Sequence, residues 1–136
     1  MKMKSITSVV LFFVCCLINA QEMDSIKFIS LSPKEFQETY NNQTSPILID
    51  VREFFEYKKS RLKSAINIPS SGDLDSVADT LNKDRSLFLY CTSGFRSKRV
   101  AKYFCAKGFS QVYSLEGGIM AWRKEGQPIE RKKLKR

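Results

Sequence analysis

The seven residues CTSGFRS, at positions 91–97, combine a thiol, three hydroxyl groups, a glycine and an arginine in one short stretch. Cys91 directly follows the apolar run LFLY, which predicts a buried strand, and a helical pattern begins within about five residues. Backbone N–H groups at a helix N-terminus and the helix dipole stabilise a negative charge. Because the thiolate is the nucleophilic form of cysteine, this arrangement predicts a nucleophilic Cys91.

The residues after Cys91 would complete such a site. Gly94 permits a tight turn, and each tenfold gain in thiolate over thiol needs only about 1.4 kcal/mol of stabilisation. Thr92 and Ser93 supply small hydrogen-bond donors, and Arg96, Lys98 and Arg99 supply positive charge for an anionic substrate. The alternative interpretation of Cys91 is a buried structural cysteine before an ordinary strand-to-helix turn.

The composition narrows the chemistry. The chain has 136 residues, 43% of them hydrophobic and 27% charged, which predicts one globular domain. It contains no histidine, which excludes a Cys–His protease and most zinc sites, and we expect neither a metal nor a cofactor. If residues 96–107 form a helix, Cys105 lies roughly 14 Å along its axis from Arg96, too far for a disulfide with Cys91. Cys105 is therefore predicted to be a core residue.

The first twenty residues have the layout of a signal peptide. Lys2 and Lys4 give a positive end, residues 6–17 are mostly apolar, and Ala20 offers a small residue at a cleavage point. The apolar run is shorter than the roughly 20 residues of a membrane span. We therefore expect export to the periplasm or the medium, the alternatives being a buried N-terminal helix or an uncleaved anchor.

Much of the net charge of +9 lies at the C-terminus, where RKKLKR holds five positive charges in six residues. Residues 129–136 are predicted to be a basic, solvated tail. The alternative is a weak attraction to anionic lipid or another polyanion. Since the basic residues form a tail and no patch with interleaved aromatic residues, we expect no nucleic-acid partner.

Strand and helix patterns alternate along the rest of the chain, which is typical of an α/β fold with a mostly parallel sheet. In such sheets ligands bind at the carboxyl ends of the strands, where Cys91 is predicted to lie. One helix has a capping box, with Ser32 as N-cap and Glu35 three residues later. Strands are expected at 26–30, 46–51, 65–68, 86–90 and 112–115, and helices at 33–40, 52–59, 74–82, 96–107 and after the glycine pair at 117–118.

Four stretches, in this order, resemble motifs of the rhodanese family of single-domain sulfurtransferases. They are LIDVREFFEY at 48–57, SAINIP at 64–69, YCTSGFRS at 90–97 and LEGGIMAW at 115–122. The resemblance implies a rhodanese-like α/β domain over 26–128, with a central parallel five-stranded sheet and helices on both faces.

The resemblance also implies a reaction. Cys91 would take sulfane sulfur from a small donor such as thiosulfate, hold it as a persulfide and pass it to cyanide or another thiophilic acceptor. The loop that holds the persulfide would comprise Thr92, Ser93, Gly94, Phe95 and Arg96. Asp50 and Arg52 match scaffold positions near the site.

One segment departs from the family pattern. The family usually has Gly-His-Ile-Pro-Gly before the alanine of the second motif, whereas residues 60–64 of this chain read SRLKS. Both glycines, the histidine and the proline are replaced. We expect this segment to be scaffold, so that the chemistry of Cys91 survives the change.

Two other functions fit a cysteine loop of this kind. Cysteine-dependent phosphatases place five residues between cysteine and arginine, but only four separate Cys91 from Arg96, and a tighter loop suits a single sulfur atom better. The domain could also be a non-catalytic sulfur-carrier or redox partner module. The oligomeric state is not indicated by the sequence.

Overall fold

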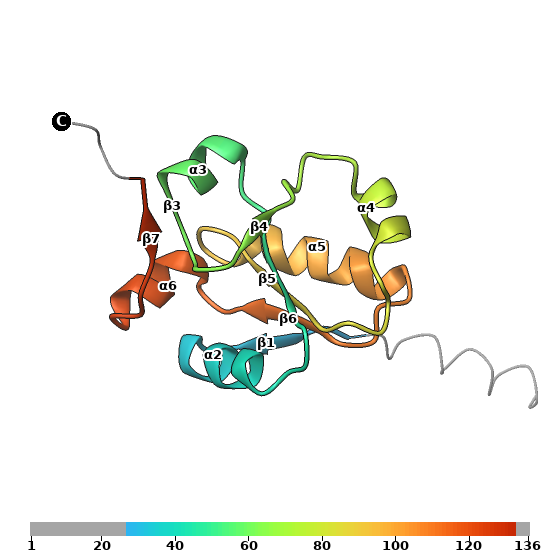
Figure 1. Ribbon diagram of the computed structural model, residues 1–136, viewed down its shortest axis with the longest axis horizontal. Helices are drawn as coiled ribbons and strands as arrows, with labels where there is room; N and C mark the ends of the chain where they lie inside the picture. Colours follow the sequence, from blue (N-terminus) through green and yellow to red (C-terminus); the bar gives the residue numbers. More distant parts are fainter. Residues whose placement is uncertain (1–26, 133–136) are drawn as a thin grey trace, which may run out of the picture.

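A computed structural model of the chain describes residues 27–132, which form a central sheet covered by helices on both faces (Figure 1). The strands are β1 (Ile29–Leu31), β2 (Ile47–Asp50), β3 (Ser60–Arg61), β4 (Ile66–Asn67), β5 (Leu87–Tyr90), β6 (Val112–Leu115) and β7 (Glu130–Arg131). The helices are α2 (Pro33–Asn41), α3 (Phe54–Lys59), α4 (Leu74–Thr80), α5 (Phe95–Ala106) and α6 (Gly118–Lys124).

The five-stranded sheet has the order β1-β6-β5-β2-β4, and every pairing in it is parallel. The central strands β2 and β5 are buried along their whole length, as their nearly unbroken apolar runs predicted. Asp50 pairs in register with Tyr90, so the carboxyl ends of these strands meet at one edge. The expected α/β fold with a parallel five-stranded sheet is thus confirmed, and Cys91 begins where β5 ends.

Two hydrophobic clusters fill the spaces between the sheet and its helices. On one face α4 and α5 pack against the sheet, with Phe104 and Cys105 of α5 buried in that cluster. On the other face α2 and α6 do so, mainly through Phe36 and Trp122. The predicted core role of Cys105 is confirmed, and its thiol is free.

Several predicted element boundaries move by a few residues. The first strand is Ile29–Leu31, later than the predicted 26–30, and the helix expected at 74–82 ends at Thr80. The helix expected at 52–59 begins only at Phe54, because Arg52 turns inward to pair with Asp50 and Glu53 caps the helix. The capping box of Ser32 and Glu35 forms as predicted.

A short antiparallel ribbon of β3 and β7 was not predicted. Ser60 pairs with Arg131 and Arg61 with Glu130, and the N–H of Lys132 donates to the carbonyl of Lys59. Ile129 packs against the cluster of α2 and α6. The predicted start of the tail at residue 129 is therefore wrong, since residues 129–132 belong to the folded domain.

The segment that departs from the family pattern is built into the scaffold. Leu62 is buried, and its N–H donates to the Tyr90 hydroxyl at 3.1 Å. Ser64, where the family has glycine, has a φ of 68°, a left-handed conformation that glycine adopts at little cost. In this chain, serine adopts this conformation at the position where the family pattern has glycine.

The predicted signal peptide at 1–20 lies outside the described residues. Within residues 27–132, no helix is long and apolar enough to cross a membrane.

Candidate functional site

The turn after β5 wraps its backbone around the sulfur of Cys91. The side chain is buried, with only 1% of the residue exposed. The N–H of Gly94 donates to Cys91 Sγ at 3.1 Å, and the Ser97 hydroxyl oxygen lies 3.7 Å from the same atom. Gly94 has a φ of 98°, which turns the chain back toward the sulfur and starts α5. The predicted position of the thiol at the start of a helix is confirmed.

These contacts favour the thiolate form of Cys91. Burial alone would raise the pKa of the thiol, but hydrogen bonds from Ser97, Gly94 and Ser93 outweigh it, and the pKa is lowered from its ordinary value. Ser97 contributes through both its hydroxyl group and its backbone N–H. The site can therefore supply a nucleophilic sulfur without an imidazole base.

Ser97 was missed as a site residue by sequence reasoning. Its hydroxyl group lies 3.1 Å from the carbonyl oxygen of Gly94 and 3.0 Å from the Ser114 hydroxyl of β6. Both serines are fully buried. The spacing of three residues from Gly94 points Ser97 back at the turn, and this could have been inferred, whereas the contact with Ser114 depends on the sheet.

The start of α6 supports the turn at Cys91 through backbone hydrogen bonds. The N–H groups of Ile119 and Met120 donate to the carbonyls of Cys91 and Thr92. At Gly118, a Cβ atom would lie 2.4 Å from the carbonyl oxygen of Thr92, so only glycine fits. Gly118 therefore allows close approach of two backbone segments, whereas a Cβ at Gly117 would meet the Ala121 side chain of its own helix.

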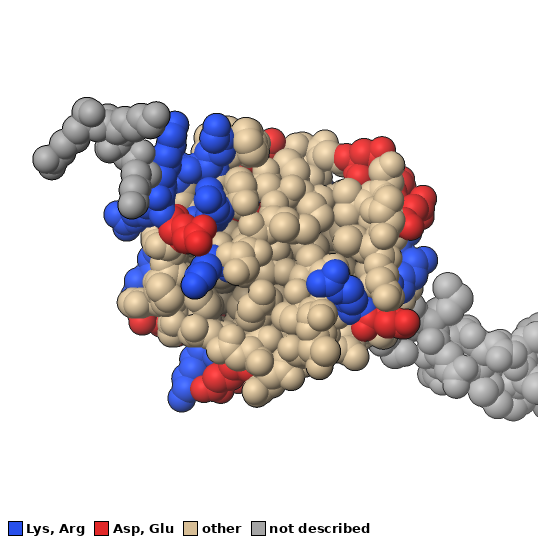
Figure 2. Space-filling model, in the orientation of Figure 1, with Lys and Arg blue, Asp and Glu red and all other residues tan. Residues whose placement is uncertain are grey.

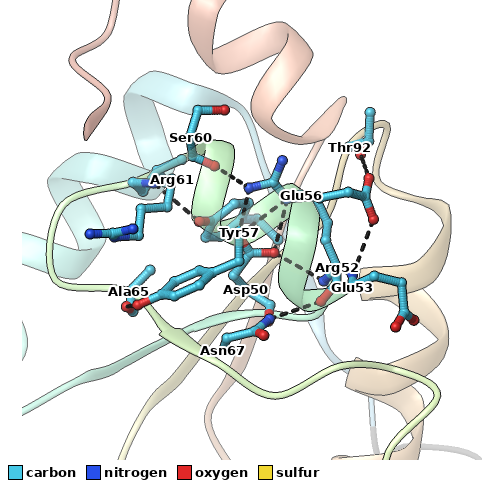
Figure 3. Close-up of polar contacts among 12 residues, drawn as sticks. Asp50, Arg52, Glu53, Glu56, Tyr57, Ser60, Arg61, Ala65, Asn67 and Thr92 are labelled. Atoms are coloured by element: carbon cyan, nitrogen blue, oxygen red, sulfur yellow. Dashed lines mark hydrogen bonds and ion pairs between the residues drawn. The ribbon is translucent and has the colours of Figure 1, made fainter. Parts of the chain in front are cut away.

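Arg96 does not extend freely toward solvent. Its guanidinium group pairs with both carboxylate oxygens of Glu56, at 2.8 and 3.1 Å, and donates to the Thr92 hydroxyl at 3.0 Å. The Thr92 hydroxyl in turn donates to Glu56 at 3.0 Å (Figure 3). Together these contacts close a ring of three side chains. The hydrogen bonds from Arg96 lower the pKa of Glu56 to about 2, so this carboxylate is ionised at neutral pH. Glu56 was not predicted as a site residue.

The other predicted loop residues have different surroundings. The side chains of Ser93 and Phe95 are exposed, and 71% of Phe95 is accessible to solvent. Lys98 and Arg99 are also exposed, on the outer side of α5. The turn thus holds the sulfur mainly by its backbone and by Ser97.

Asp50 and Arg52 fasten the end of β2 to neighbouring segments. Arg52 forms a buried ion pair with Asp50, with a shortest distance of 2.7 Å, and donates to the carbonyl of Ser60 at 2.6 Å. The Asn67 side chain donates to the carbonyls of both residues (Figure 3). Burial alone would lower the pKa of Arg52, but Asp50 outweighs it and raises the pKa. None of the hydrogen bonds or ion pairs of Asp50 and Arg52 in the described structure involves Cys91 Sγ.

Comparisons with known proteins agree with this arrangement. The sequence model of the rhodanese-like domain matches residues 32–125. The Bacillus subtilis protein YtwF, provisionally named as a sulfurtransferase, is 42% identical over 81 residues, which is 60% of this chain and 77% of that protein. The crystal structure of a rhodanese-related protein from Thermoplasma volcanium superimposes with a TM-score of 0.68 and 28% identity, over 77% of this chain and all of that one.

A longer relative shares only one part with this chain. The tRNA uridine(34) hydroxylase of Photorhabdus laumondii is 35% identical over 92 residues, which is 61% of this chain. The chain spans only 26% of the length of that hydroxylase.

Proposed function

Because this chain belongs to the rhodanese-like domain family, we propose that it is a sulfurtransferase that carries sulfane sulfur on Cys91. The donor would be a small molecule such as thiosulfate, and the acceptor cyanide or another thiophile. The observation that carries the proposal is the convergence of the Gly94 N–H and the Ser97 hydroxyl on Cys91 Sγ, together with the lowered pKa of that thiol.

The reaction has two balanced steps. The Cys91 thiolate attacks the outer sulfur of thiosulfate, a new S–S bond forms, and the bond to the sulfonate sulfur breaks and releases sulfite. Cyanide then attacks the outer sulfur of the Cys91 persulfide, thiocyanate leaves, and the thiolate returns. Charge is conserved in both steps, and no redox partner or cofactor takes part.

Two features favour sulfur over phosphate as the transferred group. The turn closes its Gly94 N–H onto the cysteine sulfur itself, and its arginine is held by Glu56. A phosphatase loop instead needs a ring of donors and a free arginine for a tetrahedral oxyanion. The activity of the longer hydroxylase is not carried over, because this chain spans only one part of it.

Mass spectrometry and kinetics test the proposal together. Incubation with thiosulfate is expected to add one sulfur atom to the protein, and cyanide to remove it as thiocyanate. Cys91→Ser should abolish both results, while Cys105→Ser, which changes a free thiol in the core, should keep the sulfur on Cys91. Wild-type protein that neither gains sulfur nor forms thiocyanate would refute an enzymatic role. Sulfur gain without turnover would indicate a carrier module.

A further inference from the structure

The turn at Cys91 offers little free positive charge to a doubly charged donor. Arg96 is the one cation of the turn at residues 91–96, and it is already paired with Glu56, with side chains only 30% and 23% exposed. Any anionic donor that uses Arg96 must compete with a carboxylate held in place by two further contacts. These contacts are the Thr92 hydroxyl and the N–H of Glu53.

A second carboxylate lies near the same arginine. Glu53 caps α3 and accepts a hydrogen bond from the Ser71 hydroxyl at 2.7 Å. Hydrogen bonds to Glu56 raise the pKa of Arg96, and the charges of Cys91 and Glu53 add to this effect. One cation therefore faces two carboxylates and the thiolate.

Lys98 and Arg99 lie outside the turn, exposed on the outer side of α5. Other basic side chains gather elsewhere. Figure 2 shows Lys and Arg gathered over the β3–β7 ribbon and the end of α3. There Arg61 pairs with Glu130 and lies over the Tyr57 ring, and Lys58 lies over the Phe54 ring. None of these contacts reaches the turn at Cys91.

The residues that flank the turn are apolar and exposed. Phe95 follows Gly94 in the turn, and Met120 donates its N–H to the carbonyl of Thr92. Their exposed fractions are 71% and 60%. Such side chains suit a donor that carries an organic group.

We propose that Glu56 is a specificity-determining residue that neutralises Arg96 and so favours sulfane donors with an organic group and a single negative charge over thiosulfate. Glu56 acts through Arg96 and does not touch the reacting sulfur, so it is a positioning residue. The inference rests on the proposed function and names the donor class of the same site.

Thiosulfate and methanethiosulfonate form a matched pair of probes. Both present an outer sulfur bonded to a sulfonyl sulfur, but thiosulfate carries two negative charges and methanethiosulfonate one. The Cys91 thiolate takes the outer sulfur from either, releasing sulfite from the first and methanesulfinate from the second. The ratio of their kcat/KM values therefore reports chiefly how the site treats charge.

Kinetics of Glu56→Gln give the decisive measurement. The substitution keeps the side-chain shape but removes the charge that holds Arg96. The kcat/KM for thiosulfate relative to methanethiosulfonate is expected to rise at least about fivefold, mainly through a lower KM for thiosulfate. Glu56→Asp retains the charge and should stay close to the wild-type ratio. Glu38→Gln, the same change on the exposed face of α2, should leave the ratio unaltered.

The outcomes separate the two proposals. An unchanged ratio in folded Glu56→Gln would overturn the role of Glu56 while leaving sulfur transfer intact. An equal change in Glu38→Gln would also overturn it, because the effect would then follow the net charge of the protein. If Glu56→Gln does not fold, Arg96→Gln tests the same ion pair, because it leaves the Glu56 carboxylate without its cation. The ratio should then fall below the wild-type value, and an unchanged ratio would overturn the role of Glu56. Failure of both donors to load wild-type Cys91 would refute the proposed function, and the inference with it.

Discussion

Ser97 is the side chain that most directly tunes the sulfur of Cys91. Its hydroxyl group and N–H both lower the pKa of the thiol, so Ser97→Ala should raise that pKa toward its ordinary value. Activity, which needs the thiolate, should then rise with pH along a curve displaced to higher pH. A hydrogen bond to a charged group contributes about 1.5–3 kcal/mol, so the rate of sulfur loading at neutral pH should fall by roughly tenfold or more. The pH dependence of persulfide formation, followed by mass spectrometry, measures both effects.

The same experiment has an internal control in β6. Ser114 contacts the Ser97 hydroxyl but not the sulfur, so Ser114→Ala should move the pH profile less than Ser97→Ala does. Identical profiles for wild type and Ser97→Ala would show that the backbone of the turn alone sets the reactivity of Cys91.

Gly118 is predicted to tolerate no side chain. Both Gly118 and Gly126 have positive φ values, 60° and 73°, but only Gly118 has backbone atoms where a Cβ would go. Gly126→Ala should therefore cost only the conformational term, about 1 kcal/mol. Gly118→Ala should lower the free energy of unfolding by at least about 3 kcal/mol and remove sulfur transfer. Urea denaturation of both variants measures the difference, and equal losses would contradict the close contact with Thr92.

The residues of the turn around Cys91 could be predicted from the local sequence. The side chains that contact this turn from other elements could not. The turn at 91–96 is encoded by contiguous residues, with Gly94 as the bend. Glu56 and Ser114 come from other elements, and no spacing in the sequence relates them to the turn. Such contacts depend on strand order, which places β6 beside β5.

At the scale of elements, the β3–β7 ribbon joins the end of the domain to the segment after α3. Removal of 133–136 leaves both strands intact and should keep the stability and sulfur transfer of the wild type. Removal of 129–136 deletes β7, the partner of β3, together with the partly buried Ile129 that packs against the cluster of α2 and α6, and should lower the free energy of unfolding by about 2–4 kcal/mol. Thermal unfolding of the two truncated proteins tests this difference. Equal stability would show that the ribbon contributes nothing to the fold.

The elements that were predicted well have strong patterns, and those that were missed have none. Buried apolar runs located β2 and β5, and the Ser32 capping box located the start of α2. The strands β3 and β7 are only two residues long, too short to show an alternating pattern. The basic composition after residue 129 is typical of a solvated tail, and it gives no sign that these residues pair with β3.

At the scale of the whole molecule, we propose that residues 1–20 direct export. The basic start, the apolar run and Ala20 support this proposal. Protein recovered from outside the cytoplasm is expected to begin at Gln21, as N-terminal sequencing or intact mass would show. Recovery of the full-length chain from the cytoplasm would contradict it.

The strand order ties the reactivity of Cys91 to the completion of the chain. β1 pairs with β6, and the turn at Cys91 is supported by N–H groups of residues 119 and 120. During synthesis, therefore, a ribosome must add nearly the whole domain before the first strand finds its neighbour. Until then Gly94 and Ser97 have no fixed position around the sulfur. Under the proposed function, a chain in which these elements have not yet packed would carry an ordinary, weakly ionised thiol, and Cys91 would gain its reactivity only in the folded domain.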